Sequence, residues 1–447
     1  MKKTLVLFAT ILFGLFLRIY QLEQLAGLDF DQEKAAFWVR DFLIYKKISL
    51  VGQEISTGGV FIGPFYYYLL SPFFSIFKMN PLAANILASL LAVVSMFMVY
   101  KIGERLFSKK VGLIALFLYA VSFRINFYDR TTAPSNLVML LSSLIFFSLL
   151  KIRAGSTKWI VVIALCLGMG FSVHPTMVAL FFIVAVVLSL FPSKINRKYL
   201  LLSALIIVLF LAPLILFDLR HEFFNSLGVL NVLSRGGLTF DGLLYKVGTN
   251  WQSLMVTLES LILPKHLGGL FILTIFFFVI RKKGKKNLES KWLLIWLIIP
   301  FILLCFYPLN VPEYYFLLTF PIFLVFFSKW IFILLGKRRI ILCLLLTLVA
   351  LFNLIELGSY KNTVGMKNKK DAIKFIIDSS SGSNFKVDYW TDLGQKNGFD
   401  YLFWYYGKVP VEDKNARRFV IVIPARKDIV KPNQTFGSIQ VIRDDVF

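Results

Sequence analysis

The segment Leu28-Asp29-Phe30-Asp31-Gln32-Glu33-Lys34 places three carboxylates within five positions, just after the first apolar run of the chain. The chain has 447 residues, of which 58% are hydrophobic and 17% are charged, whereas an average soluble domain has about 25% charged residues. Clustered carboxylates are costly in so apolar a chain unless they are solvated or functional. We therefore interpret this segment as the reactive end of a polytopic membrane protein.

The carboxylates of this segment have different interpretations. Asp29 followed by Gln32 fits a capping box at a helix N-terminus, in which the two residues satisfy each other's backbone N–H groups. For Asp31 we favour a functional role. The pattern Asp29-x-Asp31 also leaves open a divalent-metal pair, although two carboxylates in a loop are a weak signal for one.

The charge distribution excludes several other classes of protein. The net charge is +24, but Lys and Arg fall in short loops between apolar runs, which is typical of cytoplasmic loops and not of a nucleic-acid surface. Residues 4–20 follow Lys2-Lys3 without a convincing small-residue cleavage site, so we predict a retained first helix and not a signal peptide. The cysteines lie inside apolar runs and resemble small buried hydrophobic residues, not a disulfide or zinc set: Cys166, Cys305 and Cys343.

Eleven apolar runs are suited to crossing a bilayer, because a span needs about 20 residues, or fewer where neighbouring helices bury it. They are 4–20, 82–100, 111–127, 134–150, 159–173, 175–191, 199–217, 266–280, 292–308, 314–334 and 339–357. One more run, 60–77, contains Gly63-Pro64 and three consecutive tyrosines. If it crossed, every later basic loop would lie opposite Lys2-Lys3, against the positive-inside rule. We therefore expect 60–77 to lie at the outer interface or to re-enter, with a cytoplasmic N-terminus and an extracytoplasmic C-terminus.

The expected outer side then holds loop 21–81, loop 218–265 and the tail 358–447. The tail alternates like an α/β unit, with a predicted helix and three predicted strands: Asn368–Asp378, Phe385–Trp390, Arg418–Ala425 and Ser438–Arg443. The predicted fold class is an all-α polytopic membrane protein of about eleven transmembrane helices with a small extracytoplasmic α/β C-terminal domain. Residues 1–357 form its transmembrane domain, with a catalytic first outer loop at 21–81, and residues 358–447 form the tail domain.

Ionisable residues collect at the expected outer ends of the spans, and the central turns carry essentially none. A transporter would place polar groups near the midplane, on broken helices in two related halves. A non-catalytic membrane assembly protein would need no outer carboxylate near arginines. The pattern favours an enzyme that acts at the outer surface on a lipid-linked substrate, with a lipid or polysaccharide transporter as the alternative.

Several outer residues also have simpler explanations. Arg130 can snorkel to lipid headgroups, and Asp129 can pair with a neighbouring arginine. His174 precedes Pro175 between two spans and fits a turn. The run Tyr66–Tyr68 fits an aromatic belt at the membrane interface.

The order of motifs carries a resemblance to a known family. One helix is followed by Phe30-Asp31-Gln32-Glu33, then by Gly63-Pro64-Phe65-Tyr66-Tyr67-Tyr68-Leu69, by Tyr100–Phe107, and by Phe127-Tyr128-Asp129-Arg130 ahead of Pro134. Over roughly residues 1–225 this resembles the GT-C membrane glycosyltransferases. It is most similar to the family-39-like branch of protein O-mannosyltransferases and of the aminoarabinose transferase of lipid A.

The resemblance implies transfer of a sugar from a polyprenyl-phosphate donor to a protein, lipid or glycan acceptor outside the cytoplasm. It implies an acidic general base in the first outer loop, often as an Asp-Glu pair. Here Asp31 is followed by Gln32, with Glu33 one position further, so Asp31 and Glu33 are the catalytic candidates. The family's two tyrosines near the lipid phosphate map to Tyr67 and Tyr315.

The chemistry of such a transfer fits these residue types. The acceptor hydroxyl needs a base, which Asp31 can supply, and the leaving phosphate needs positive charge and hydrogen bonds. Arg130, Arg220 and His221 lie at expected outer ends of spans and are candidates for substrate binding, because arginine grips phosphate through a planar fork. We expect a multi-pass plasma-membrane enzyme in contact with membrane lipid. No resident cofactor is indicated beyond the open possibility of a divalent metal at Asp29 and Asp31.

Overall fold

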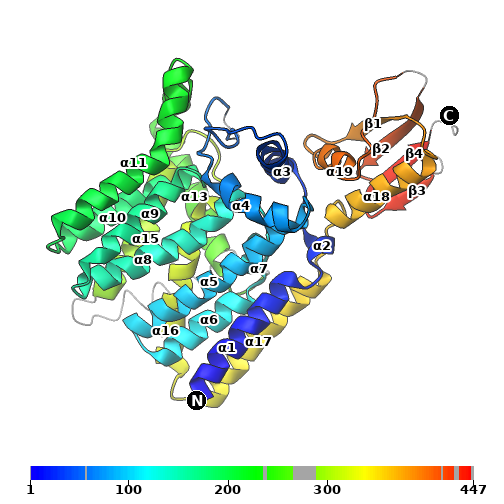
Figure 1. Ribbon diagram of the computed structural model, residues 1–447. Coiled ribbons are helices and arrows are strands. Elements are labelled where there is room, and N and C mark those ends of the chain that lie inside the picture. The colour runs from blue at the N-terminus through cyan, green and yellow to red at the C-terminus, as the bar shows by residue number, and fades with distance from the viewer. Residues whose placement is uncertain are drawn as a thin grey trace.

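The structure, a computed structural model, describes residues 2–55, 58–234, 239–264, 288–413, 416–426 and 432–443. Long helices run side by side in one array, and a small sheet with two helices lies beyond one end of it (Figure 1). The helices of the first half are α1 (Lys2–Ile19), α2 (Leu22–Leu25), α3 (Phe30–Leu43), α4 (Phe65–Ile76), α5 (Leu82–Leu106), α6 (Lys109–Val121), α7 (Phe123–Arg130), η1 (Pro134–Asn136), α8 (Leu137–Arg153), η2 (Thr157–Trp159), α9 (Ile160–Gly170), η3 (Pro175–Met177), α10 (Val178–Leu190) and α11 (Arg197–Arg220).

The array is completed by helices from the second half of the chain. They are α12 (Phe224–Ser234), α13 (Phe240–Ser260), α15 (Leu288–Cys305), η4 (Glu313–Thr319), α16 (Phe320–Leu335) and α17 (Arg339–Ser359). The span expected at 266–280 lies outside the described residues.

Among the described helices, five are long and apolar enough to cross a membrane. A sixth candidate is the pair α6 and α7, which is bent by 64°. Shorter apolar helices lie at further positions where the sequence predicts spans: Thr4–Ile19, Thr157–Gly170, Pro175–Leu190 and Lys291–Cys305. The fold class of a polytopic helical membrane protein is thus confirmed, while the number of about eleven spans stays a prediction.

The ambiguous run 60–77 forms a short helix and not a long one. Its helix α4 has 12 residues. Such a helix is about 18 Å long, against a hydrocarbon core of about 30 Å. Because α9 and α10 are about as short, the length of α4 alone does not decide whether it crosses, and the interfacial or re-entrant position of 60–77 stays a prediction.

Close approach of small residues sets the packing of α5 against α6. A Cβ atom added to Gly103 would lie 2.8 Å from the Cα atom of Gly112, so the two backbones meet where only glycine fits. Small residues at helix contacts are the usual way in which membrane helices approach closely, because lipid offers no hydrophobic drive between them.

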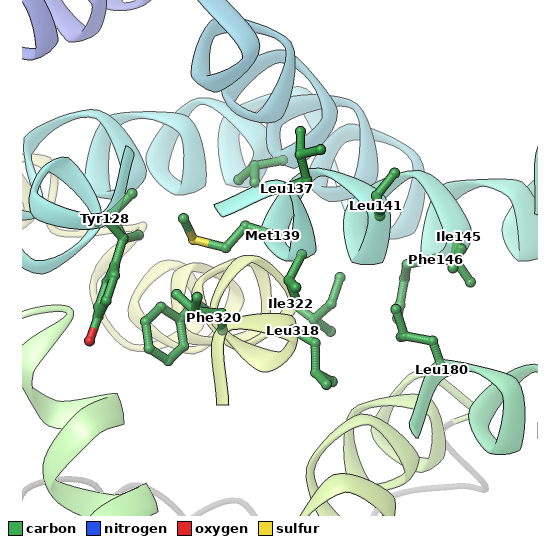
Figure 2. Packing of buried hydrophobic residues seen from close by; sticks show 14 of the residues in the cluster. Tyr128, Leu137, Met139, Leu141, Ile145, Phe146, Leu180, Leu318, Phe320 and Ile322 are labelled. Carbon is green, nitrogen blue, oxygen red and sulfur yellow. The ribbon is translucent and has the colours of Figure 1, made fainter. Parts of the chain in front are cut away.

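Figure 2 shows part of the core of the array, where apolar side chains of α7, α8, α10, η4 and α16 pack together, and the same cluster extends over α3–α6, α9, α13 and α15. One polar group inside this core is fully paired. The Ser142 hydroxyl donates to the carbonyl of Leu318 at 2.6 Å and accepts from the indole Nε1 of Trp296 at 2.9 Å. Buried polar atoms that are paired in this way do not destabilise the core.

The tail contains a four-stranded sheet in the order β1-β2-β4-β3. Its elements are α18 (Met366–Ser379), β1 (Phe385–Thr391), α19 (Phe399–Tyr405), β2 (Arg417–Ile423), β3 (Gln434–Phe436) and β4 (Ile439–Arg443). Strands β1 and β2 pair in parallel, and the other neighbours are antiparallel. The predicted helix and three strands are confirmed, whereas the short elements α19 and β3 were not predicted.

Candidate active site

The acidic segment 28–34 forms the start of α3, as its capping pattern predicts. Asp29 is the N-cap residue, and Gln32 Oε1 accepts from the Asp29 backbone N–H at 3.1 Å. The Asp29 carboxylate also pairs with Lys369 Nζ of the tail at 3.1 Å. An ammonium group at this distance makes Asp29 a poor ligand for a divalent cation. Within the described parts of the chain, no group of three or more His, Cys, Asp or Glu side chains forms a potential metal site.

Asp31 lies in the first turn of α3 and is mostly buried. Its Oδ1 accepts from Gln53 Nε2 at 3.1 Å, and Oδ2 has no partner among the described residues. Burial raises the pKa of the Asp31 carboxyl above its ordinary value of 3.8, while the Gln53 hydrogen bond and the charge of Lys34 oppose this rise. Asp31 thus has one oxygen held in place and one oxygen available to a substrate. Nothing in the sequence around Gln53 indicates this role.

Tyrosines surround this carboxylate. Tyr66, Tyr67 and Tyr314 are near enough for the charge of Asp31 to act on their hydroxyls. Tyr67 is fully buried, its hydroxyl accepts from the Gln53 backbone N–H at 3.0 Å, and its ring stacks on Trp38 at 5.1 Å. Tyr67 therefore braces the segment that holds Asp31.

The predicted residue Tyr315 lies in a neighbouring cluster of rings. Its hydroxyl is 3.4 Å from that of Tyr307, and its ring is 4.8 Å from His174 and 5.0 Å from Tyr314. Burial lowers the pKa of His174 to about 4, so its imidazole is neutral at pH 7. The turn role weighed for His174 is present, because its Nδ1 caps η3. Its ring nevertheless joins the tyrosine cluster.

Glu33 points to the tail and not to the surroundings of Asp31. It is buried, and its Oε1 accepts from the Tyr401 backbone N–H at 3.0 Å at the start of α19. The Gly398 backbone N–H donates to the same carboxylate. Glu33 thus caps a helix of the tail, and we leave it out of the reacting groups.

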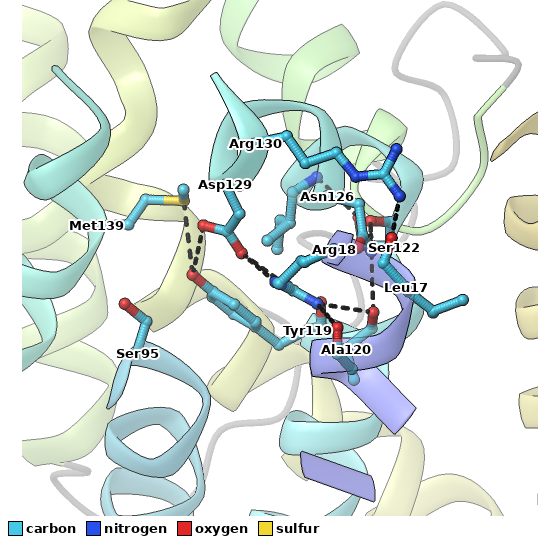
Figure 3. Close-up of polar contacts among 12 residues, drawn as sticks. Leu17, Arg18, Ser95, Tyr119, Ala120, Ser122, Asn126, Asp129, Arg130 and Met139 are labelled. Carbon is cyan, nitrogen blue, oxygen red and sulfur yellow. Dashed lines mark hydrogen bonds and ion pairs between the residues drawn. The ribbon is translucent and has the colours of Figure 1, made fainter. Parts of the chain in front are cut away.

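Arg130 lies beside a buried ionic network that the sequence indicated only in part (Figure 3). Asp129 pairs with an arginine, as its simpler explanation has it, but the partner is Arg18 of α1, far away in the chain, at 2.6 Å. Arg130 is 5% exposed, donates through one terminal nitrogen to the Leu17 carbonyl, and leaves its Nε without a partner. Such burial does not fit an arginine that snorkels to lipid headgroups.

A cavity of about 210 Å³ lies next to Arg130. It is lined by residues of the 25–32 segment, of α7 and of the end of α17 and the chain that follows it: Leu25, Ala26, Gly27, Asp29, Gln32, Phe123, Phe127, Arg130, Thr131, Leu357, Tyr360 and Asn362. Because Asp29 and Gln32 flank Asp31, the cavity lies beside the first turn of α3.

Arg220 and His221 are exposed at the end of α11. The His221 ring stacks on Phe217 at 4.2 Å, and Phe217 contacts Phe61 at 5.6 Å. Backbone hydrogen bonds tie Ile62 to Gly52 and Gln53, and so join Phe61 to Gln53, the partner of Asp31. The structure therefore places the end of α11 on the Gln53 side of Asp31, while Arg130 belongs to the Asp29 and Gln32 side. No contact in the described chain brings Arg130 and Arg220 together.

Comparison with known proteins identifies the fold. A family model described as dolichyl-phosphate-mannose-protein mannosyltransferase matches residues 62–217, and no curated protein sequence matches the chain significantly. The solved structure of ArnT from Cupriavidus metallidurans bound to undecaprenyl phosphate matches with a TM-score of 0.61 at 11% identity, over 98% of this chain and 97% of that one. The oligosaccharyltransferase of Archaeoglobus fulgidus, tethered with an acceptor peptide, matches with a TM-score of 0.52 at 16% identity, over 91% of this chain and 63% of that one.

Identities this low show a shared fold and not a shared substrate. The family match and the structural matches agree with each other, and both agree with the order of motifs in the first half of the chain. The chain is a multi-pass membrane protein with the GT-C glycosyltransferase fold, and its residues 62–217 carry the sequence pattern of the dolichyl-phosphate-mannose-protein mannosyltransferases.

Proposed function

We propose that this protein transfers a sugar from a polyprenyl-phosphate donor to an acceptor hydroxyl at the outer face of the membrane, with Asp31 as general base. The observation that carries the proposal is the state of Asp31. It is a mostly buried carboxylate with one oxygen held by Gln53 and one oxygen without a partner in the described chain, at the start of a short helix outside the predicted spans. The GT-C fold supplies the reaction class, since ArnT and the archaeal oligosaccharyltransferase are sugar-transfer proteins.

The reaction needs little beyond this arrangement. The acceptor oxygen forms a bond to the anomeric carbon of the sugar, and its proton passes to Asp31 Oδ2. The bond between the anomeric carbon and the phosphate oxygen breaks, and the polyprenyl phosphate leaves with the electron pair. Phosphate is a good leaving group, so the protein has to supply hydrogen bonds and positive charge more than a strong acid. A raised pKa makes the ionised Asp31 carboxylate a better base.

We assign the donor to the Gln53 side of Asp31. The polyprenyl chain stays in lipid, so its phosphate must lie near the outer interface. Tyr314 and Tyr315 are candidates for hydrogen bonds to it, with Tyr67 as the brace behind them. Arg220 and His221 lie on the same side, exposed at the end of α11, where a phosphate could meet them.

The proposal places the first outer loop and the tail outside the cytoplasm, in the plasma membrane, with the N-terminus inside. Ser381 is exposed in the tail and Ser75 is exposed in α4. Each is replaced by cysteine in a chain free of other cysteines and treated with a membrane-impermeant maleimide. Labelling of both in intact cells is expected. Labelling of Ser381→Cys only after the cells are opened would reverse the orientation.

Mass spectrometry of cells with and without the gene tests the function itself. The expected result is one surface glycan or glycolipid that lacks a single sugar in the deleted strain, together with accumulation of a polyprenyl-phosphate sugar. Unchanged glycans and unchanged lipid-linked sugars would remove the enzymatic interpretation. Accumulation of a lipid-linked sugar on the inner leaflet alone would favour a transporter.

A further inference from the structure

The cavity beside Arg130 has the features of a binding site that the donor does not need. It lies on the Asp29 and Gln32 side of Asp31, whereas the tyrosine cluster lies around Asp31 with Gln53. A transferase has to bring two substrates to one base from different directions. Asp29 and Gln32 line the cavity and Asp31 does not, so an acceptor held there would reach Asp31 past the first turn of α3.

Three hydrogen-bond donors line this cavity without a partner in the described chain. Arg130 is 5% exposed, and its Nε has no hydrogen-bond partner. Gln32 uses Oε1 for the Asp29 backbone and leaves its amide nitrogen free. The Tyr360 hydroxyl has no partner either, and its ring is half-buried against Phe127 at 5.9 Å. Of the three donors only the Arg130 Nε is buried, and an unpaired buried donor is costly unless a ligand or water satisfies it.

The charges around the cavity leave a surplus of positive charge. The Asp29 carboxylate is neutralised by Lys369 at 3.1 Å, and Asp129 is neutralised by Arg18 at 2.6 Å. Asp129 also faces Arg130, so the two carboxylates Asp29 and Asp129 stand against the three cations Lys369, Arg18 and Arg130. The site thus favours a ligand with an acceptor-rich, negatively charged group, for which the arginine fork is well suited.

The remaining wall is aromatic. Phe123 and Phe127 lie edge-on to the Tyr360 ring, at 5.8 and 5.9 Å. Aromatic rings pack against the apolar C–H face of a sugar ring, while the polar groups opposite them bond its hydroxyls. These aromatic side chains would add nothing to the binding of a small anion without a sugar ring.

We propose that this cavity binds the acceptor of the transfer, through a sugar residue that carries a phosphate or other anionic group. The inference rests on the proposed function and names the class of its acceptor. The anion pairs with Arg130 and with the Gln32 amide, the sugar ring lies against Phe127 and Tyr360, and a hydroxyl of the ring faces Asp31.

Binding of a small probe tests this directly. Glucose 6-phosphate is titrated into the purified full-length protein by calorimetry, with glucose and inorganic phosphate as comparisons and undecaprenyl phosphate as the probe for the donor side. Glucose 6-phosphate should bind more tightly than either comparison. Gln32→Glu keeps the capping oxygen and adds a negative charge, so it should weaken glucose 6-phosphate by at least about tenfold, the scale of one charge-assisted hydrogen bond.

Further variants separate the two sides of Asp31. Arg130→Gln and Tyr360→Phe should weaken glucose 6-phosphate and leave undecaprenyl phosphate within about twofold, whereas Tyr45→Phe, an exposed tyrosine of the first loop, should change neither. Tyr360→Phe keeps the packed ring, so it can be used for the binding test if Arg130→Gln does not fold. Equal weakening of undecaprenyl phosphate, or its competition with glucose 6-phosphate, would make the cavity a donor phosphate site and overturn the inference. No binding of glucose 6-phosphate to the wild-type protein would overturn it as well.

The proposed function fails on different evidence. Asp31→Asn should bind both probes normally and lose turnover. Full turnover in Asp31→Asn would refute the general base, whatever the cavity binds. In that case, weaker binding of glucose 6-phosphate to the Gln32 and Tyr360 variants, with normal binding of undecaprenyl phosphate, would still support the cavity as a site for a phosphorylated sugar.

Discussion

Lys369 offers the sharpest test of how the tail and the reactive helix are joined. It is fully buried, and its Nζ donates to the Leu28 carbonyl at 2.8 Å, to the Asn397 carbonyl at 2.8 Å and to Asp29 at 3.1 Å. One ammonium group therefore ties α18, the turn before α19 and the start of α3 together. Lys369→Met keeps the apolar stem and removes all three bonds.

The size of the loss follows from the partners. Each buried carbonyl left without a donor costs about 1–3 kcal/mol, so two cost about 2–6 kcal/mol. Asp29 is 63% exposed and is solvated when its partner is lost, so the ion pair adds little. Relief from burying the ammonium offsets part of the total. We expect a net loss of about 2–4 kcal/mol in the docking of the tail, or about 30- to 1,000-fold in local opening.

Hydrogen exchange with mass spectrometry measures this opening. Peptides that cover residues 28–43 and 397–405 should exchange about 30- to 1,000-fold faster in Lys369→Met. Lys367→Met is the matched control on the same helix, because Lys367 is half-exposed and its contact to Asp371 is 3.9 Å long. It should stay within about 0.5 kcal/mol of the wild type. Wild-type exchange in Lys369→Met would show that the tail does not depend on this lysine.

Further predictions concern chemistry, donor binding and helix packing. Only ionised Asp31 is a base, so kcat/KM should fall as the pH drops through the Asp31 pKa, which lies above 3.8. The Gln53 hydrogen bond lowers this pKa, so Gln53→Leu should move the acid limb of the pH profile to higher pH. Arg220→Lys keeps the charge and loses the planar fork, so it should weaken donor use in a titration with the polyprenyl-phosphate sugar, whereas an arginine that only snorkels would tolerate lysine. Gly112→Ala puts a Cβ 2.6 Å from a carbonyl of α5 and should cost about 1–3 kcal/mol in thermal unfolding, whereas Gly248→Ala, with open space around it, should not destabilise.

The fold followed from the sequence where its signal is local. Apolar runs and loop charges predict the helices of the array, and the continuous run of aromatic and β-branched residues at 419–423 predicts β2. In the structure Phe419, Ile421 and Ile423 enter one core, while Val420 and Val422 face the other side. The helix α19 has only seven residues, and its N-terminus is capped by Glu33, far away in the chain. A cap of that kind leaves no pattern near the helix that it stabilises.

The site was predictable only where its residues are close together in the sequence. Asp29 and Gln32 are three residues apart, so their capping relation is visible in the sequence, and Asp31 stands out as a carboxylate in an apolar chain. Gln53 and Lys369 are ordinary polar residues in polar segments, and only the folded chain brings them to Asp31 and Asp29. The sequence also grouped Arg130 with Arg220 because both end apolar runs. In the structure Arg130 is buried beside the Asp29 and Gln32 side of Asp31, whereas Arg220 is exposed at the end of α11.

Comparison of Asp31→Asn with Asp29→Asn in cells tests the general base most directly. Both variants are expressed at equal levels in the deleted strain, and the sugar missing from the surface glycan is quantified by mass spectrometry. Asn caps a helix as well as Asp, so Asp29→Asn should retain most of the transfer. Asp31→Asn keeps the shape and removes the base, so transfer should fall at least ~100-fold. Equal losses at both positions, with loss of activity in the chelator EDTA, would point to a metal pair, and full transfer in Asp31→Asn would contradict the assignment of the base.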